Sequence, residues 1–186
     1  RLDLEIMKTQ LDISKLLEIG KIQNELDFER ALIADRKLRV LSKEDSKYKV
    51  IRKNLRNLIA DYEDKNWSST SRISDKKLRE SDIAELIAEN ERQFIQNRKV
   101  IIRKKLKSFN LTQQGLGAVL GHRSKSYMSE LMNGVSPFSL KDLIVINRIL
   151  KIDLTDLVPT FLPQSDRIKI RTSIQKLDNP KLKLSK

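Results

Sequence analysis

The segment from Asn110 to Gly134, NLTQQGLGAVLGHRSKSYMSELMNG, constrains the fold of this chain more than any other stretch. Thr112 is placed to cap a first short helix with its hydroxyl group, and Gly121 allows the open backbone conformation that ends a helix. Ser124 is the natural cap of a second helix, which ends at Gly134. Two helices this short do not fold alone, so the surrounding sequence must supply the core that holds them together.

The expected second helix has an apolar side and a polar side. Its apolar residues recur at spacings of one, three and four, which favours burial of one face. A helix-turn-helix presents the polar residues of such a helix to the major groove of DNA. The apolar positions are Tyr127, Met128, Leu131 and Met132, and the polar ones are Lys125, Ser126, Ser129 and Glu130.

This segment resembles the Cro/C1-type (XRE) helix-turn-helix. The positions that match the family pattern are Leu111, Thr112, Gln113, Leu116, Gly121, Met128, Leu131, Asn133 and Gly134. Gly117 stands where the family usually has Ala, at a cost in helix propensity of about 1 kcal/mol. The turn His122-Arg123-Ser124 is one residue longer than usual. The resemblance implies a five-helix, lambda-repressor-like domain, which we expect over residues 75–165.

The same resemblance implies roles in DNA binding by position in the motif. The implied base-reading residues are Lys125, Ser126 and Glu130, with Tyr127 as the replacement for Ser126 if the longer turn shifts the start of the helix. The residues expected to hold the DNA backbone are Gln113, Arg123, Ser124 and Asn133. We expect the partner to be double-stranded operator DNA, bound by a homodimer.

The first third of the chain has a long helical period. Residues 2–41 contain no Pro and one Gly, so we expect one amphipathic helix that bends at Gly20. A second amphipathic helix is expected from Tyr48 to near Trp67. Together they predict a helical hairpin over residues 1–66, whose apolar stripe must be covered by a partner protein, a second copy or the rest of the chain.

Composition shifts mark the rest of the layout. The Ser- and Thr-rich stretch at residues 67–74 is the expected linker, and helical sequence resumes at Asp75 or Ser81. The basic run at residues 98–107 is either a solvated helix face or a source of long-range attraction for DNA. Residues 166–186 form a basic tail, for which a short strand followed by disorder and a flexible tail are both open.

Charge and composition limit the classes of function. The net charge is +13, of which residues 1–66 carry +2, residues 67–165 carry +6 and residues 166–186 carry +5. This distribution suits a polyanion such as DNA, although a solubilising surface is the alternative. The chain has no Cys and one His, so we expect no metal site and no cofactor. Without a long apolar run or a signal-peptide pattern, we expect a soluble, cytoplasmic protein.

Two further tracts resemble the HigA antitoxins of type II toxin-antitoxin modules. They are ELDFERAL at residues 25–32 and LIADYEDK at residues 58–65, followed by the helix-turn-helix. Asn66 and Trp67 stand where that family often has a His and a Tyr-Pro pair. The resemblance implies a non-enzymatic protein that neutralises a RelE-like ribonuclease toxin and represses its own operon. The toxin-binding residues expected on the hairpin are Glu25, Phe28, Leu32, Leu55, Leu58 and Tyr62.

Two other functions are weighed against this one. The first is a stand-alone XRE-family repressor whose N-terminal hairpin serves only dimerisation. The second is an enzyme acting on nucleic acid, which we do not expect because no carboxylate cluster, Gly-rich phosphate loop or His/Cys constellation is evident in the sequence. The expected fold class is all-α, with an N-terminal helical hairpin followed by the five-helix helix-turn-helix domain.

Overall fold

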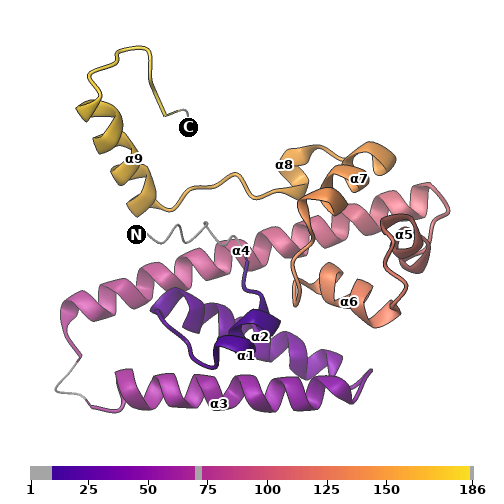
Figure 1. The fold of residues 1–186 in the computed structure, drawn as a ribbon, viewed down its shortest axis with the longest axis horizontal. Helices are drawn as coiled ribbons and strands as arrows, with labels where there is room; N and C mark the ends of the chain where they lie inside the picture. The colour runs from indigo at the N-terminus through magenta and orange to yellow at the C-terminus, as the bar shows by residue number, and fades with distance from the viewer. Residues whose placement is uncertain (1–9, 70–72, 185–186) are drawn as a thin grey trace.

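The structure is a computed structural model that describes residues 10–69 and 73–184 (Figure 1). All regular secondary structure in these ranges is helical, which confirms the all-α fold class. None of the helices in these ranges is both long and apolar enough to cross a membrane. The helices are α1 (Ile13–Ile19), α2 (Glu25–Leu41), α3 (Lys47–Trp67), α4 (Asp75–Ser108), α5 (Gln113–Leu120), α6 (Lys125–Asn133), α7 (Leu140–Leu150), α8 (Leu154–Leu157) and α9 (Gln164–Lys176).

The N-terminal helices form a bundle in which α2 lies between α3 and α4 (Figure 1). Leu38 and Leu55 are fully buried where α2 meets α3. Alanines on α2 and α4 are also buried, and their small side chains allow the two helices to approach closely. The apolar stripe of the hairpin is therefore covered by the chain itself, which is one of the three alternatives that the sequence left open.

The expected single helix over residues 2–41 is wrong within the described residues, and residues 1–9 lie outside them. Gly20 has a φ of 73° and its N–H donates to the carbonyl of Leu16, so it ends α1 and does not bend a longer helix. Asn24 then caps α2 by accepting a hydrogen bond from the Asp27 N–H at 2.8 Å. A left-handed glycine followed by a new cap separates two helices.

Helix α4 is continuous from Asp75 to Ser108 and belongs to two cores. Its cap is Ser74, which accepts from the Lys77 N–H at 3.3 Å, and Ser81 lies inside the helix. The first half packs on α2, while Ile102 in the second half is fully buried in the core of the C-terminal helices. The expected boundary at residues 67–74 therefore separates α3 from α4 but not the two cores, which meet along α4.

The second core lies between the end of α4 and helices α5 to α8. Its fully buried residues include Leu116, Leu131 and Ile146, one from each of three successive helices. The predicted N-caps Thr112 and Ser124 are confirmed, because their hydroxyls accept from backbone N–H groups three residues ahead, and the hydroxyl of Ser139 caps α7 in the same way. Each cap satisfies a donor that the helix leaves unpaired.

The strand that the sequence allowed after Asp166 is wrong, because Gln164–Lys176 forms helix α9. The brief alternation of Ile168 and Ile170 has no second strand to pair with among the described residues, and a lone strand is unstable in water. Figure 1 shows α9 standing apart from the other helices, at the end of an extended connection. Residues 177–184 contain no further helix.

Candidate nucleic-acid interface

Helices α5 and α6 pack closely because Gly117 has no side chain. A Cβ atom at this position would lie 2.7 Å from Met128 Cγ on α6 and 2.9 Å from the carbonyl oxygen of His122. The N–H of His122 donates to the carbonyl of Gly117 at 2.7 Å, which brings the turn back onto α5. The glycine that departs from the XRE pattern thus has a packing reason, whereas the sequence indicated only its propensity cost.

The polar side of α6 divides into exposed and engaged residues. Lys125 is exposed, and Tyr127 is 37% exposed with its ring edge-on to His122 at a centroid distance of 5.1 Å. Ser126 and Glu130 are partly buried, although they lie on the side of α6 opposite Met128. The sequence placed Tyr127 on the apolar face, and the structure places it on the surface.

The connection between α2 and α3 covers the middle of this polar side. We call residues 42–48 the α2–α3 corner. Ser126 Oγ donates to Asp45 Oδ2 at 3.2 Å, and Lys47 Nζ lies 2.8 Å from Glu130 Oε1. The hydroxyl of Tyr48 donates to Glu130 Oε1 at 2.9 Å and lies 3.3 Å from the carbonyl oxygen of Ser126. Two of the four predicted base-reading residues are therefore bound to the N-terminal bundle.

Tyr48 is the central residue of this contact. Its side chain is 2% exposed and belongs to the N-terminal core, so the corner is anchored on one side while its hydroxyl reaches α6. Burial raises the pKa of the Tyr48 phenol, and the hydrogen bond to the Glu130 carboxylate raises it further. The phenol therefore remains a neutral donor to Glu130 at neutral pH.

The predicted backbone-binding residues also differ in availability. Arg123 is exposed and Gln113 partly exposed at the start of α5. The Ser124 hydroxyl already caps α6 through the Tyr127 N–H at 3.1 Å. Asn133 is engaged within the protein, because its Oδ1 atom accepts from Lys99 Nζ at 2.6 Å. Of the predicted DNA-contacting residues, the structure leaves Gln113, Arg123, Lys125 and Tyr127 with accessible side chains that make no side-chain hydrogen bond within the described part of the chain.

The apolar residues of the expected toxin-binding stripe are buried or partly buried. Leu55 is fully buried, and Phe28 is 6% exposed with its ring stacked on Tyr62 at a centroid distance of 4.9 Å. Leu32 and Leu58 pack against the same core. Helical period shows which residues are buried but not what buries them, and here the two arms of the hairpin bury each other.

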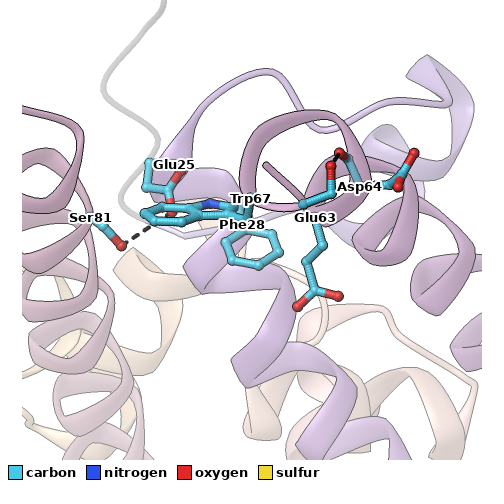
Figure 2. Close-up of a pocket in the computed structure, with 7 residues that line it drawn as sticks. Glu25, Phe28, Glu63, Asp64, Trp67 and Ser81 are labelled. Atoms are coloured by element: carbon cyan, nitrogen blue, oxygen red, sulfur yellow. Dashed lines mark hydrogen bonds between the residues drawn. The ribbon is translucent and has the colours of Figure 1, made fainter. Parts of the chain in front are cut away.

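Two of the predicted toxin-binding residues, Glu25 and Phe28, line an open pocket. Figure 2 shows this pocket near the end of α3. Its volume is about 590 Å³. Its walls include Phe28, Trp67 and the exposed carboxylates of Glu63 and Asp64. Glu25 itself accepts from the Tyr62 hydroxyl at 2.9 Å and from the Ser81 hydroxyl at 3.2 Å.

The single histidine has a structural environment. His122 Nε2 lies 3.1 Å from Asp142 Oδ1, and Asp142 completes the capping box of α7 with Ser139. Within the described ranges, no group of three or more His, Cys, Asp and Glu side chains is arranged to hold a metal ion. The geometry around His122 therefore ties the turn before α6 to the start of α7.

Neither a protein-family model, nor a curated protein, nor a solved structure matches this chain. The resemblance to XRE-type regulators and HigA antitoxins therefore rests on motif residues alone and stays a prediction. Asp45, Lys47 and Tyr48 complete the surroundings of α6, and the sequence did not indicate this role for them. Their distance from α6 in the chain left no signal that would have paired them with it.

Proposed function

We propose that this protein is a sequence-specific DNA-binding regulator that uses α5 and α6 as a helix-turn-helix and represses transcription as a dimer. The observation that carries the proposal is the tight, doubly capped pairing of α5 and α6, with Gly117 seated against Met128. This arrangement gives α6 one apolar face and one polar face. The charge of +6 on residues 67–165 supplies the field that attracts DNA.

The described conformation is the DNA-free form in this proposal. Ser126 and Glu130 cannot reach base edges while Asp45, Lys47 and Tyr48 are bound to them. DNA binding then requires the α2–α3 corner to leave α6. The exposed Arg123 and Lys125 make the first contact with phosphates and bases, and displacement of the corner frees the middle of the helix.

An antitoxin function is the second candidate, and the pocket in Figure 2 is the observation that favours it. Burial of the apolar stripe removes the surface on which this function first rested. The pocket, however, combines two aromatic walls with the exposed carboxylates of Glu63 and Asp64, which suits a basic side chain of a toxin. If the cognate toxin is neutralised equally by wild type and by the Glu63→Ala, Asp64→Ala double variant, this pocket is not the toxin site.

The primary proposal is tested by selection of DNA from a pool of duplexes with a randomised segment. We expect enrichment of a palindrome with half-sites about 34 Å apart, because a dimer of helix-turn-helix domains spans one helical turn. A selection that enriches no sequence above the starting pool would remove the proposal. Selection of an isolated half-site as strongly as of the palindrome would remove the dimer.

Variants then separate base reading from phosphate binding. Lys125→Ala should change the preference at one position of the selected site by about 1–3 kcal/mol. Arg123→Ala should weaken binding to all sequences alike and reduce the salt dependence by about one phosphate contact. Equal losses on every sequence for Lys125→Ala would show that Lys125 does not read bases.

A further inference from the structure

A cationic cavity of about 320 Å³ lies where α2, α4 and the end of α6 meet. Arg36 and Lys37 reach it from α2, Arg92 and Gln96 from α4, and Asn133 from α6. Three of these lining residues are cations, and none of the described lining residues is a carboxylate. Its volume lies at the lower end of the range for small-molecule sites.

The positive charge around this cavity is poorly compensated. Lys37 makes no hydrogen bond or ion pair with any residue in the described part of the chain. Arg98, which is 5% exposed and lies near Lys37, donates among the described residues only to neutral atoms, the carbonyl of Leu157 at 3.1 Å and Oε1 of Gln10 at 3.4 Å. Lys99 likewise donates to the neutral Asn133 amide.

Two carboxylates of α4 near the cavity, Glu89 and Glu91, are already engaged. Glu89 holds Arg92 through two contacts of 2.7 Å, and both Glu89 and Glu29 interact electrostatically with Arg36. Glu91 is bound to Arg30 at 2.6 Å and 2.7 Å. Lys37 therefore faces Arg92, Arg98 and Lys99 from α4 without an opposing charge of its own, and its pKa is lowered to about 8 by burial and then by these three cations.

We propose that this cavity binds a phosphate group, either as free phosphate or as the ester of a small molecule. A partly buried lysine beside other cations is costly unless an anion accompanies it, and phosphate offers several strong acceptors to several donors at once. Lys37 is the principal ligand because it has no competing partner. Arg36 and the Gln96 amide complete the donor set from two helices, so a bound phosphate joins α2 to α4.

The test uses the full-length protein in chloride buffers at constant ionic strength. Isothermal titration calorimetry with sodium phosphate should show one saturable site per chain in the wild type. Lys37→Met retains the apolar stem and should lower the affinity about tenfold or more, the usual loss for one charge-assisted hydrogen bond. Lys104→Met, which removes an exposed cation from the far half of α4, should leave the affinity unchanged.

Thermal melting tests whether the Lys37→Met variant is folded. We expect its melting temperature not to fall, because the substitution removes a charge that lies beside other cations. Titration with a phosphate monoester such as adenosine monophosphate distinguishes the sources. Tighter binding of the ester indicates a small-molecule phosphate, and tighter binding of inorganic phosphate indicates the free ion. The proposal is overturned if the wild type binds neither, or if Lys37→Met binds both as tightly as the wild type.

Discussion

Single residues fix how α2 and α4 meet, and the clearest case is a buried ion pair. Arg30 donates to both carboxylate oxygens of Glu91, at 2.7 Å and 2.6 Å, and to Asp27 at 3.0 Å. All three residues are buried. Removal of one partner from a buried pair is costly because the remaining charge loses its counterion.

We therefore expect Glu91→Gln to lower the free energy of unfolding by about 3 kcal/mol, measured by urea denaturation. Glu85→Gln is the matched control, because Glu85 is an exposed acid on the same helix and its loss should change stability by less than about 0.5 kcal/mol. Equal effects of the two substitutions would show that the Arg30–Glu91 pair does not hold α2 against α4.

The lowered pKa of Lys37 should make the free energy of unfolding depend on pH. Its pKa falls from 10.5 in the unfolded chain to about 8, because of burial and then Arg92, Arg98 and Lys99. The folded state binds the Lys37 proton less tightly than the unfolded chain does, so protonated Lys37 destabilises the folded state. This destabilisation is fully present below about pH 8 and disappears as the pH approaches 10.5. In buffers without phosphate, Lys37→Met should be more stable than wild type by about 1–3 kcal/mol at pH 7.

The difference between the two proteins should shrink to near zero by pH 10.5, the value at which Lys37 is losing its proton in the unfolded chain too. Denaturant unfolding of both proteins at pH 7, 9 and 10.5 measures it, and other titrating groups cancel in the comparison. A stability difference that is constant across this range would contradict the burial of a protonated Lys37.

At the scale of elements, the pairing of α5 with α6 depends on the absence of a side chain at Gly117. Gly117→Ala should gain about 1 kcal/mol of helix propensity, but its Cβ would lie 2.7 Å from Met128 Cγ and 2.9 Å from the His122 carbonyl oxygen. Because the second neighbour is backbone, we expect a net loss of about 1–3 kcal/mol, measured by thermal or urea unfolding. Gly115→Ala is not a clean control, since its Cβ would meet Leu111.

Ala118→Gly provides the control for propensity, because Ala118 is an exposed neighbour on the same helix. It should lose about 1 kcal/mol, as expected for glycine in a helix. If Gly117→Ala were stabilising by the same amount, the close approach of α5 and α6 would not be the reason for the glycine.

The local sequence predicted where the helices lie in the chain better than which helices pack against each other. The caps Thr112, Ser124 and Ser139 were predictable because each is fixed by a hydrogen bond to a residue three positions away. The role of Gly20 was predicted wrongly, because a glycine within a helical pattern is compatible both with a bend in one helix and with the end of a helix. The strand expected after Asp166 failed because two alternating isoleucines do not supply a neighbouring strand.

The candidate interface was predicted in part. The turn and the polar side of α6 follow from residues 110–134, and the structure leaves Lys125 and Tyr127 exposed there. The engagement of Ser126 and Glu130 was not predictable, because their partners lie 81 and 82 residues away in the chain. Such contacts depend on how α2 and α3 pack on α4, which short-range patterns do not specify.

At the scale of the whole molecule, two cores share one long helix and meet a second time at the α2–α3 corner. Helix α4 links the cores covalently, so they cannot separate there without breaking its backbone hydrogen bonds. The corner is different, because hydrogen bonds and one exposed ion pair hold Asp45, Lys47 and Tyr48 to α6. Contacts of this kind are each worth about 1 kcal/mol, so we expect the corner to be displaced more easily than the contacts along α4.

Breaking the corner should therefore strengthen DNA binding. Tyr48→Phe keeps the buried ring but removes the hydroxyl that contacts Glu130 and Ser126. We expect the affinity for the selected duplex to rise about fivefold, the equivalent of one hydrogen bond, in a fluorescence anisotropy titration. Tyr62→Phe, which removes a hydroxyl bound to Glu25 away from α6, should leave the affinity unchanged.

A reversible lock between the corner and α6 tests the mechanism most directly. The chain contains no Cys, so the double variant Asp45→Cys, Ser126→Cys carries only two thiols, at positions whose native side chains lie 3.2 Å apart. A short thiol cross-linker joins them, and each single variant treated with the same reagent is the control for chemical modification. Because the unlinked double variant provides the reference, loss of the Ser126 hydroxyl does not affect the comparison.

The decisive measurement is the dissociation constant of the selected duplex for the cross-linked and the unlinked double variant, determined by fluorescence anisotropy. We expect the cross-link to weaken binding at least about tenfold, because the corner then cannot leave the polar side of α6. Equal affinity of the cross-linked and unlinked proteins, with both binding the duplex, would show that DNA does not require the covered side of α6.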